Sequence, residues 1–271
     1  MQASTQVAQL DELLIDGGVR VASAIEFVDV YKSFAGNSVL DGLSMAIPEG
    51  RISMIMGPSG VGKSVCIKHM VGLTFPDAGD VLVEGESVPA MTMPSLLEMR
   101  KKFGVTFQDG ALFSSMSLFD NVAFPLRQLT DKSESEIAAI VERGLHDVGL
   151  ADAMGSHPSA LSGGMRKRAG FARALVLDPH IVLFDEPDSG LDPVRRSLLC
   201  DLIREVHEQR GGTYVVITHD MLTARNIAEY ICLMWKGKIV EAGSAEQVFQ
   251  SENPFVRQFL SGEADGPLGM E

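Results

Sequence analysis

The chain has 271 residues, of which 45% are hydrophobic, so it is long enough to bury the core of one domain together with a subdomain. Its formal net charge of −13 argues against binding to a nucleic-acid backbone, which requires a basic face. The three cysteines lie far apart without metal-ligand spacing, which is typical of a protein kept in a reducing compartment.

The first 23 residues form a polar, acidic segment, which predicts a flexible tail ahead of the folded part. They lack the basic start and the long apolar stretch of a signal peptide. No apolar run in the chain approaches the ~18 residues that are needed to cross a bilayer. We therefore expect a soluble, cytosolic protein, for which another chain supplies any membrane-spanning part.

Two segments near the N-terminus alternate apolar and polar residues. They are "AIEFVDVYKSF" (24–34) and "SVLDGLSMAI" (38–47), and they predict an antiparallel pair of strands around a Gly-Asn turn. The apolar run "RISMIM" (51–56) predicts a buried strand, and a glycine-rich loop and a helix over about 63–73 follow it. Segment 77–88, "DAGDVLVEGESV", again has the pattern of a hairpin.

From about residue 114 to 160 the pattern is mostly helical, and "SESEIAAIVERGLHDVGL" predicts an amphipathic helix there. Strands and helices then alternate: "IVLFDE", a helix over 193–210, "TYVVIT", a helix over 221–229, and "ICLMWKGKIVEAG". All-apolar strands that alternate with helices predict a mostly parallel sheet covered on both faces. We therefore expect an α/β fold over 24–248, with an N-terminal antiparallel β subdomain and an inserted α-helical subdomain over about 109–165.

The glycine-rich stretch "GPSGVGKS" satisfies the pattern G-x-x-x-x-G-K-[ST] with Gly57, Gly62, Lys63 and Ser64. Its glycines let backbone N–H groups face inward as an anion-binding nest at the positive end of the next helix. Lys63 would reach the β- and γ-phosphates of a nucleotide, and the Ser64 hydroxyl would bind Mg²⁺. The flanking strand and helix favour this phosphate loop over a glycine-rich turn that arose by chance.

Two acidic residues end the apolar run "IVLFDEP". Asp185 is suited to hold Mg²⁺ through water, and Glu186 is suited to accept a proton from an attacking water. Two acids that merely cap a strand at a turn are the alternative, and the upstream phosphate loop makes it the weaker one.

The stretch "LSGGM" begins at Leu161 and leads into a helix. Small residues with free N–H groups at the start of a helix form a second anion site. One chain has no obvious use for two phosphate sites on different segments unless the sites close on each other across a dimer.

The motifs "GPSGVGKS", "FQDG", "LSGGM", "IVLFDEP", "SGLD" and "ITHD", in this order, resemble those of the ATP-binding subunits of ABC transporters. The resemblance covers about residues 24–243. It implies a P-loop NTPase fold, with ATP and Mg²⁺ as cofactors and hydrolysis in a dimer. It places ATP contacts at Phe34, Gly57, Pro58, Ser59, Gly60, Gly62, Lys63, Ser64, Ser162, Gly163, Gly164 and Asp192.

The resemblance also assigns individual roles. Phe34 matches an aromatic residue that stacks on adenine, with Tyr31 as the local competitor and a buried aromatic as the alternative. Gln108 matches the γ-phosphate sensor that also contacts the metal and couples to the membrane subunit. Asp192 matches the residue that joins the two sites across the dimer, and His219 matches the histidine that braces the γ-phosphate. The implied catalytic residues are Glu186, His219 and Gln108, and the implied metal ligands are Ser64, Gln108 and Asp185.

One position departs from the common pattern, because Met165 stands where the signature of the family usually has glutamine. Ser162 and Gly164 match the residues that contact the γ-phosphate held by the partner, so we expect hydrolysis to survive. The departure fits a narrower resemblance. The chain resembles the ATPases of Mla and Mce lipid-transport systems, in which Met replaces this glutamine. The resemblance lies in three stretches: segment 107–127, "SGGMRKRAGFARALVLDP" and "VRQFLSGEADGPLG".

That narrower resemblance implies transport of phospholipids or other lipids, with the chain peripheral on the cytoplasmic face of the inner (plasma) membrane. The implied partners are a second copy of the chain, an integral membrane permease, an accessory regulatory subunit and a lipid-binding subunit, with no nucleic acid. Two alternatives stay open: an ATPase for a small solute such as an amino acid, and a soluble ABC ATPase outside transport. The latter class usually carries coiled-coil inserts or two ATPase modules, which this sequence lacks.

Two apolar segments allow two interpretations each. Leu112, Phe113 and Phe119 suit either a groove for a helix of the membrane subunit or the core of the helical subdomain. In segment 249–271, Phe255, Val256, Phe259 and Leu260 lie on one face of a short helix, and "GEADGPLG" after it predicts an extended arm. The arm either reaches a neighbouring subunit or is a disordered tail behind a helix docked on its own domain.

Overall fold

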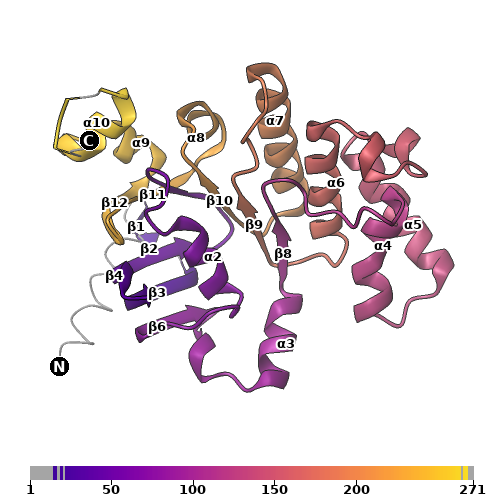
Figure 1. Cartoon of the computed structure of the whole chain (residues 1–271), viewed down its shortest axis with the longest axis horizontal. Coiled ribbons are helices and arrows are strands. Elements are labelled where there is room, and N and C mark those ends of the chain that lie inside the picture. The colour runs from indigo at the N-terminus through magenta and orange to yellow at the C-terminus, as the bar shows by residue number, and fades with distance from the viewer. Residues whose placement is uncertain (1–14, 17–18, 21, 264, 268–271) are drawn as a thin grey trace. The chain divides into compact units, whose positions relative to one another are not determined.

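A computed structural model describes residues 15–16, 19–20, 22–263 and 265–267. The chain divides into two compact units, the first formed by 1–97 with 217–271 and the second by 98–216 (Figure 1). Most of the predicted N-terminal tail lies outside the described residues. The described part of that segment forms a short antiparallel pair, β1 (Ile15–Asp16) and β2 (Val19–Arg20). The domain boundaries expected from the sequence remain a prediction.

The first unit contains the predicted antiparallel subdomain. Its strand order is β4-β3-β6-β7, with bounds β3 (Ser23–Phe34), β4 (Asn37–Pro48), β6 (Ala78–Val83) and β7 (Glu86–Ser87). Every neighbouring pair in this sheet is antiparallel. Phe27 lies opposite Met45 on β4 and Val81 on β6, and all three side chains are buried. The alternating patterns therefore predicted this sheet correctly, because one face of each strand packs into a core.

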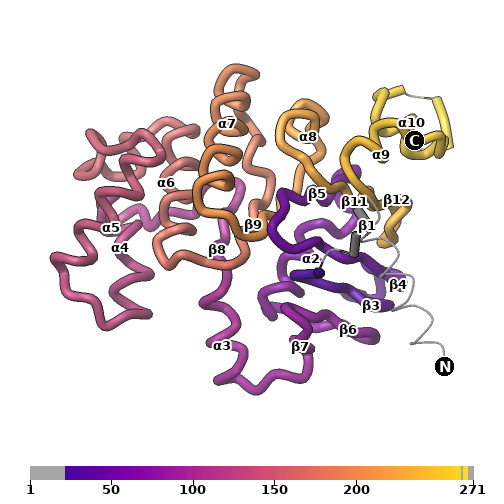
Figure 2. The backbone as a smooth tube through the Cα atoms, turned by 180° about the vertical axis from the view of Figure 1, so that it is seen from behind, coloured from indigo at the N-terminus to yellow at the C-terminus, as the bar shows by residue number. Residues whose placement is uncertain are grey.

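The same unit contains part of the predicted parallel sheet. β5 (Ile52–Met56) has five buried residues and pairs in parallel with β11 (Tyr230–Trp235), which pairs in antiparallel with β12 (Lys238–Ser244). The helices of this unit are α2 (Lys63–Met70), α8 (Met221–Ile227), α9 (Ala245–Phe249) and α10 (Pro254–Ser261). Helices α2 and α8 end two or three residues before the ends expected from the sequence. Figure 2 shows α9 and α10 close to β12.

The second unit holds a parallel pair of strands and a group of helices. β8 (Phe103–Thr106) pairs in parallel with β9 (Ile181–Asp185). The helices of this unit are α4 (Leu118–Leu129), α5 (Glu134–Asp147), α6 (Gly163–Leu175) and α7 (Pro193–Arg210). α3 (Met93–Lys101) and β10 (Thr213–Thr218) extend across the boundaries between the units. The sequence reasoning missed α3, β8 and α9.

Side chains of strand and helix meet in the core of the second unit. The ring of Phe184 on β9 lies 5.1 Å from that of Phe171 on α6 and 5.8 Å from that of Tyr214 on β10, measured between centroids. All three side chains are at most 1% exposed. Burying an aromatic ring gives the largest favourable contribution per residue to the stability of a core. The packing of these rings therefore fixes the position of β9, and so the point from which the next residues leave the strand.

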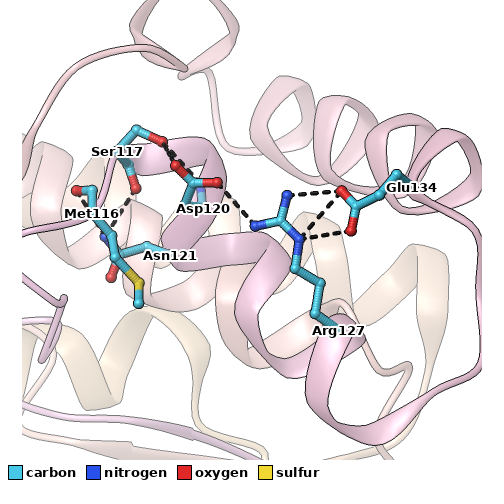
Figure 3. A network of polar contacts seen from close by, with 6 residues as sticks. All are labelled: Met116, Ser117, Asp120, Asn121, Arg127 and Glu134. Carbon is cyan, nitrogen blue, oxygen red and sulfur yellow. Dashed lines mark hydrogen bonds and ion pairs between the residues drawn. The ribbon is translucent and has the colours of Figure 1, made fainter.

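Helices α4 and α5 are joined by ion pairs at the surface of the second unit (Figure 3). The guanidinium group of Arg127 pairs with Asp120 at 2.9 Å and with Glu134 at 2.8 Å. The hydrogen bonds from Arg127 lower the pKa of Glu134, and the Ser117 hydroxyl and Arg127 lower that of Asp120. Because the groups are largely exposed, the network contributes little stability and chiefly fixes the geometry of the two helix starts.

No helix among the described residues is long and apolar enough to span a bilayer.

Candidate functional site: a phosphate loop and an acidic strand end

The predicted phosphate loop lies between β5 and α2 in the first unit. Gly57 has φ 147°, and a Cβ atom there would collide with the backbone carbonyl oxygen of Met234, so a side chain has no room. Gly62 caps α2 with φ 107°. Both conformations favour glycine, which gives a steric reason for these two motif positions.

Lys63 is the charged residue of this loop, and it is only 5% exposed. Its ammonium group donates to the carbonyl oxygens of Gly57 at 2.7 Å and Pro58 at 2.8 Å. The first turn of α2 carries no acidic residue, so this helix start has no negative charge in its first turn that would repel an anion. Ser64 is exposed beside it. The arrangement is able to bind a phosphate group by charge and by backbone N–H donors.

In the second unit β9 ends at Asp185, and Glu186 follows it directly, so both acids lie at the strand end that the sequence predicts. Both are partly exposed. Glu186 has φ 48°, a left-handed conformation that is uncommon for a residue with a side chain. Such strain is typical of a functional position that the surrounding structure holds in place.

A residue that the sequence reasoning did not select contacts this turn. Lys167 on α6 donates to the carbonyl oxygens of Glu186, Pro187 and Ser189. Burial lowers the pKa of Lys167, and the carboxylates of Asp188 and other nearby acids oppose that effect. No local pattern could have revealed this contact, because it joins two segments about twenty residues apart.

Gln108 follows β8 and is exposed, and its amide donates to the Ser189 hydroxyl at 3.0 Å. The loop after it is braced by Arg173, which donates to the carbonyl oxygens of Ala111 at 2.8 Å and Gly110 at 3.0 Å. Gln108 therefore contacts the same turn that Lys167 holds, and both contacts lie within the second unit.

The start of α6 presents the second candidate anion site. Ser162 caps the helix, and its hydroxyl accepts from the backbone N–H of Met165 at 3.3 Å. A side chain at Gly163 or Gly164 would meet no neighbour closer than 3.9 Å. Neither glycine has a positive φ, so the fold of this chain does not itself require glycine at either position. Bare backbone here favours close approach by a group from outside the chain.

Met165 lies half-buried beside these glycines. It lines a cavity of about 410 Å³ together with side chains of the 191–202 segment, among them Leu191, Leu198 and Leu202. A thioether suits this apolar wall, which gives a local physical reason for methionine where the family signature has glutamine.

Asp192 and His219 occupy helix starts. Asp192 caps α7 by accepting from the backbone N–H groups of Val194 at 3.1 Å and Arg195 at 3.0 Å, and the Arg195 N–H chiefly lowers the pKa of Asp192. His219 is exposed directly after β10. Asp220, which the sequence reasoning passed over, accepts from Thr223 N–H at 2.7 Å and so fixes the turn that carries His219.

The two aromatic candidates for adenine stacking are both 44% exposed. The Tyr31 hydroxyl lies against the α-carbon of Gly42 on the neighbouring strand, where it packs on its own sheet. Phe34 lies at the end of β3, and the ammonium group of Lys32 is 5.5 Å from its ring centroid. The exposure of Phe34 leaves it accessible to another ring, whereas the buried-aromatic alternative fits neither residue.

The apolar segment after Gln108 contributes both to a core and to a surface. Leu112 and Phe119 are partly buried, while Phe113 is 43% exposed with its ring 5.0 Å from that of Phe124. The buried side chain of Asn121 accepts from Phe113 N–H. It also donates to the carbonyl oxygens of Met116 and Ser117, as Figure 3 shows. The loop is therefore fixed by a buried amide, and it presents Phe113 at the surface.

The predicted C-terminal helix is confirmed as α10. Val256 is buried, and Phe255, Phe259 and Leu260 are partly buried. The side chain of Gln258 is 5% exposed and donates to the carbonyl of Glu263 at 3.2 Å. The first described residues of the arm thus fold back on α10, and most of the arm's end lies outside the described residues. That the arm reaches a neighbour stays a prediction.

The comparisons with known proteins agree on one family. The family model described as "ABC transporter" matches residues 40–189. "Probable ribonucleotide transport ATP-binding protein mkl" of Mycobacterium leprae is 46% identical over 255 residues, which are 94% of this chain and 74% of that protein. "Intermembrane phospholipid transport system ATP-binding protein MlaF" of Escherichia coli K12 is 41% identical over 248 residues, which are 92% of each chain.

Solved structures confirm the predicted fold class. CbiO1 of Clostridium perfringens, described as part of the ABC transporter complex cbiONQ, matches with a TM-score of 0.78 and 27% identity, over 85% of this chain and 92% of that one. The ATP-binding cassette MJ0796, solved as a dimer after hydrolysis with ADP and Pi, matches with a TM-score of 0.75 and 28% identity, over 82% and 98%. The chain therefore belongs to the ABC transporter family, as an ATP-binding subunit that hydrolyses ATP.

Proposed function

We propose that this ATP-binding subunit drives the transport of phospholipids or related lipids by a separate membrane permease. The observation that carries the proposal is the similarity to MlaF, which extends over 92% of both chains. The two proteins thus match along nearly their whole length. Met165 in the signature supports the same assignment, since it fits the resemblance to lipid-transport ATPases.

A second candidate cargo is a ribonucleotide. The mkl protein of Mycobacterium leprae has the higher identity, 46%, but this chain matches only 74% of its length. A small solute such as an amino acid is the third candidate. An ATP-binding subunit of this family does not contact the cargo, so none of its residues recognises the cargo directly.

The proposed ATP contacts begin with the phosphate loop. Lys63 would exchange its bonds to loop carbonyls for the β- and γ-phosphates, and the glycines would supply backbone N–H donors. Phe34 would stack on adenine, since its ring is open to solvent. Glu186 would take the proton of the attacking water, with His219 bracing the γ-phosphate.

Mg²⁺ fits the proposed ligands chemically. Ser64, Gln108 and Asp185 supply a hydroxyl, an amide oxygen and a carboxylate, which are the hard oxygen donors that Mg²⁺ takes together with water and phosphate oxygens. When bound, the ion neutralises charge that develops on the phosphates. Ser64 and Gln108 are both exposed, and the amide nitrogen of Gln108 donates to the Ser189 hydroxyl, so the side chains of both residues can be reached by an ion.

The second proposed ATP contact comes from a second copy of the chain. Ser162, Gly163 and Gly164 would bind the γ-phosphate held by the partner. The backbone of the two glycines is bare although the fold itself does not require glycine there, and Ser162 adds a hydroxyl beside them. Asp192 would join the two sites across the dimer. The further proposed partners are a permease, a regulatory subunit and a lipid-binding subunit, with the chain peripheral on the cytoplasmic face of the inner membrane.

The experiment that tests the cargo is purification of the assembled complex through a tag on this chain. We expect a membrane permease to co-purify, with phospholipid in the complex extractable and countable by mass spectrometry. In proteoliposomes of the complex, ATP should move labelled phospholipid between membranes or to a soluble acceptor. ATP-dependent movement of a labelled ribonucleotide or amino acid, with no movement of lipid, would replace the lipid assignment by the corresponding alternative.

Replacing Met165 with glutamine tests the departure in the signature. Because Met165 lies against an apolar wall and its backbone N–H is held by Ser162, the variant should keep its fold and change ATP turnover by no more than about threefold. ATP affinity should be unchanged. Steady-state hydrolysis and ATP titration measure both, and complete loss of activity would show that Met165 supports the site in a way this geometry does not reveal.

A further inference from the structure

We propose that Lys167 is a positioning residue for ATP hydrolysis, whose ammonium group holds the backbone turn that carries Glu186. The inference rests on the role proposed above for Glu186. Lys167 lies in the second turn of α6, the helix that Ser162 caps, and every contact used here lies within the second unit.

Three carbonyl oxygens of one turn converge on the Lys167 ammonium group. Its distance is 3.4 Å to that of Glu186, 2.9 Å to that of Pro187 and 2.6 Å to that of Ser189. An ammonium group has three N–H donors, so these bonds use its full capacity. The residue is 9% exposed, and water therefore competes little for the carbonyl groups.

The turn needs such support because its backbone is strained. Glu186 has φ 48°, which its side chain disfavours. It also precedes Pro187, and a residue before proline is driven toward extended conformations. The direction of the Glu186 carboxylate depends on this backbone, so the hydrogen bonds from Lys167 fix where a proton acceptor can lie.

A purely structural role is the alternative. Asp188, Asp109 and Glu186 are the carboxylates whose charges act on Lys167, so the lysine could simply balance nearby negative charge, of which only that of Asp188 is buried. The two roles differ in what a substitution changes. Charge balance affects folding stability, whereas positioning affects kcat and leaves ATP affinity in place.

The test uses the full-length chain with Lys167→Met, which keeps an unbranched side chain of nearly the same length and removes the donors. We expect kcat for ATP hydrolysis to fall by roughly 10–100-fold, because small misplacements of a catalytic group are costly. KM and the ATP dissociation constant should stay within about twofold. Lys167→Arg, which keeps charge and donors, should restore most of kcat.

Arg168→Met is the matched control. Arg168 lies on the same helix and also donates to loop carbonyls, those of Val148 at 2.7 Å and Gly149 at 3.3 Å, but that loop carries no proposed site residue. Its kcat should stay within about twofold of wild type. Equal losses of kcat in the two variants, or wild-type kcat in Lys167→Met, would overturn the inference.

Two further variants keep the result interpretable. Lys167→Gln retains two N–H donors but no charge, and it takes the place of Lys167→Met if that variant does not fold. An intermediate kcat in Lys167→Gln supports the positioning role, and a wild-type kcat contradicts it. Glu186→Gln separates the two proposals. Wild-type turnover in Glu186→Gln removes the base role itself, whereas loss of turnover there with full turnover in Lys167→Met removes only the role of the lysine.

Discussion

Replacing Glu186 with glutamine is expected to abolish nearly all ATP turnover while ATP affinity stays within about twofold of the wild-type value. Glutamine has the size of glutamate, so the backbone turn held by Lys167 should persist, but its amide cannot accept the proton of the attacking water. Loss of a general base typically costs about 10²–10⁴-fold in rate. Steady-state hydrolysis and ATP titration measure the two quantities separately.

The matched control is Glu208→Gln, the same chemical change at an exposed position of α7 in the same unit. Its turnover should equal that of the wild type. Because hydrolysis is what separates the proposed ATP-bound dimer, Glu186→Gln should also accumulate as a dimer with ATP, visible by size-exclusion chromatography. A variant that hydrolyses ATP at the wild-type rate would exclude Glu186 as the base.

Lys63→Ala is expected to weaken ATP binding by roughly 10–100-fold. A hydrogen bond to a charged group contributes about 1.5–3 kcal/mol, and each 1.4 kcal/mol is a factor of about ten in affinity. The buried ammonium group also bonds the carbonyls of Gly57 and Pro58, so its removal loosens the loop as well. Equilibrium titrations with ATP and with AMP separate the lost phosphate contacts from the loosened loop. AMP has no β- or γ-phosphate, so loss of those contacts should weaken the affinity for ATP far more than that for AMP.

Lys68→Ala is the control for charge, because Lys68 lies on the same helix with its side chain exposed. It removes the same charge without touching the loop, and ATP affinity should not change. Unaltered ATP affinity in Lys63→Ala would contradict the assignment of the phosphate loop. Equal weakening for ATP and AMP would instead assign Lys63 to the shape of the loop alone.

The sequence by itself determined the elements with strong local patterns. β5 and β10 could be predicted because runs of apolar residues suit strands buried on both faces, and α7 because helices alternate with such strands along the chain. The phosphate loop and the acidic strand end were recognisable because they too have strong local patterns. Each motif needs particular residue types within a few positions, and their order along the chain identified the family.

Other elements have weak local sequence patterns and could not be predicted from them. β8 is only four residues long, and α3 carries two large exposed apolar side chains, Met93 and Leu97, so neither shows a clear period. The tertiary structure decided them, because β8 gains its hydrogen bonds from β9, far along the chain. Strand pairing of this kind leaves little trace in a short sequence window.

Tertiary structure also decided which side chains support the candidate site. Lys167 and Asn121 look like ordinary residues of amphipathic helices, yet one holds the turn of Glu186 and the other fixes the loop that presents Phe113. Their importance comes from buried carbonyl and N–H groups on other segments, which must find partners once water is excluded. The sequence specifies the residues that meet ATP through local chemistry, whereas the residues that hold them in place are specified only by what folding brings beside them.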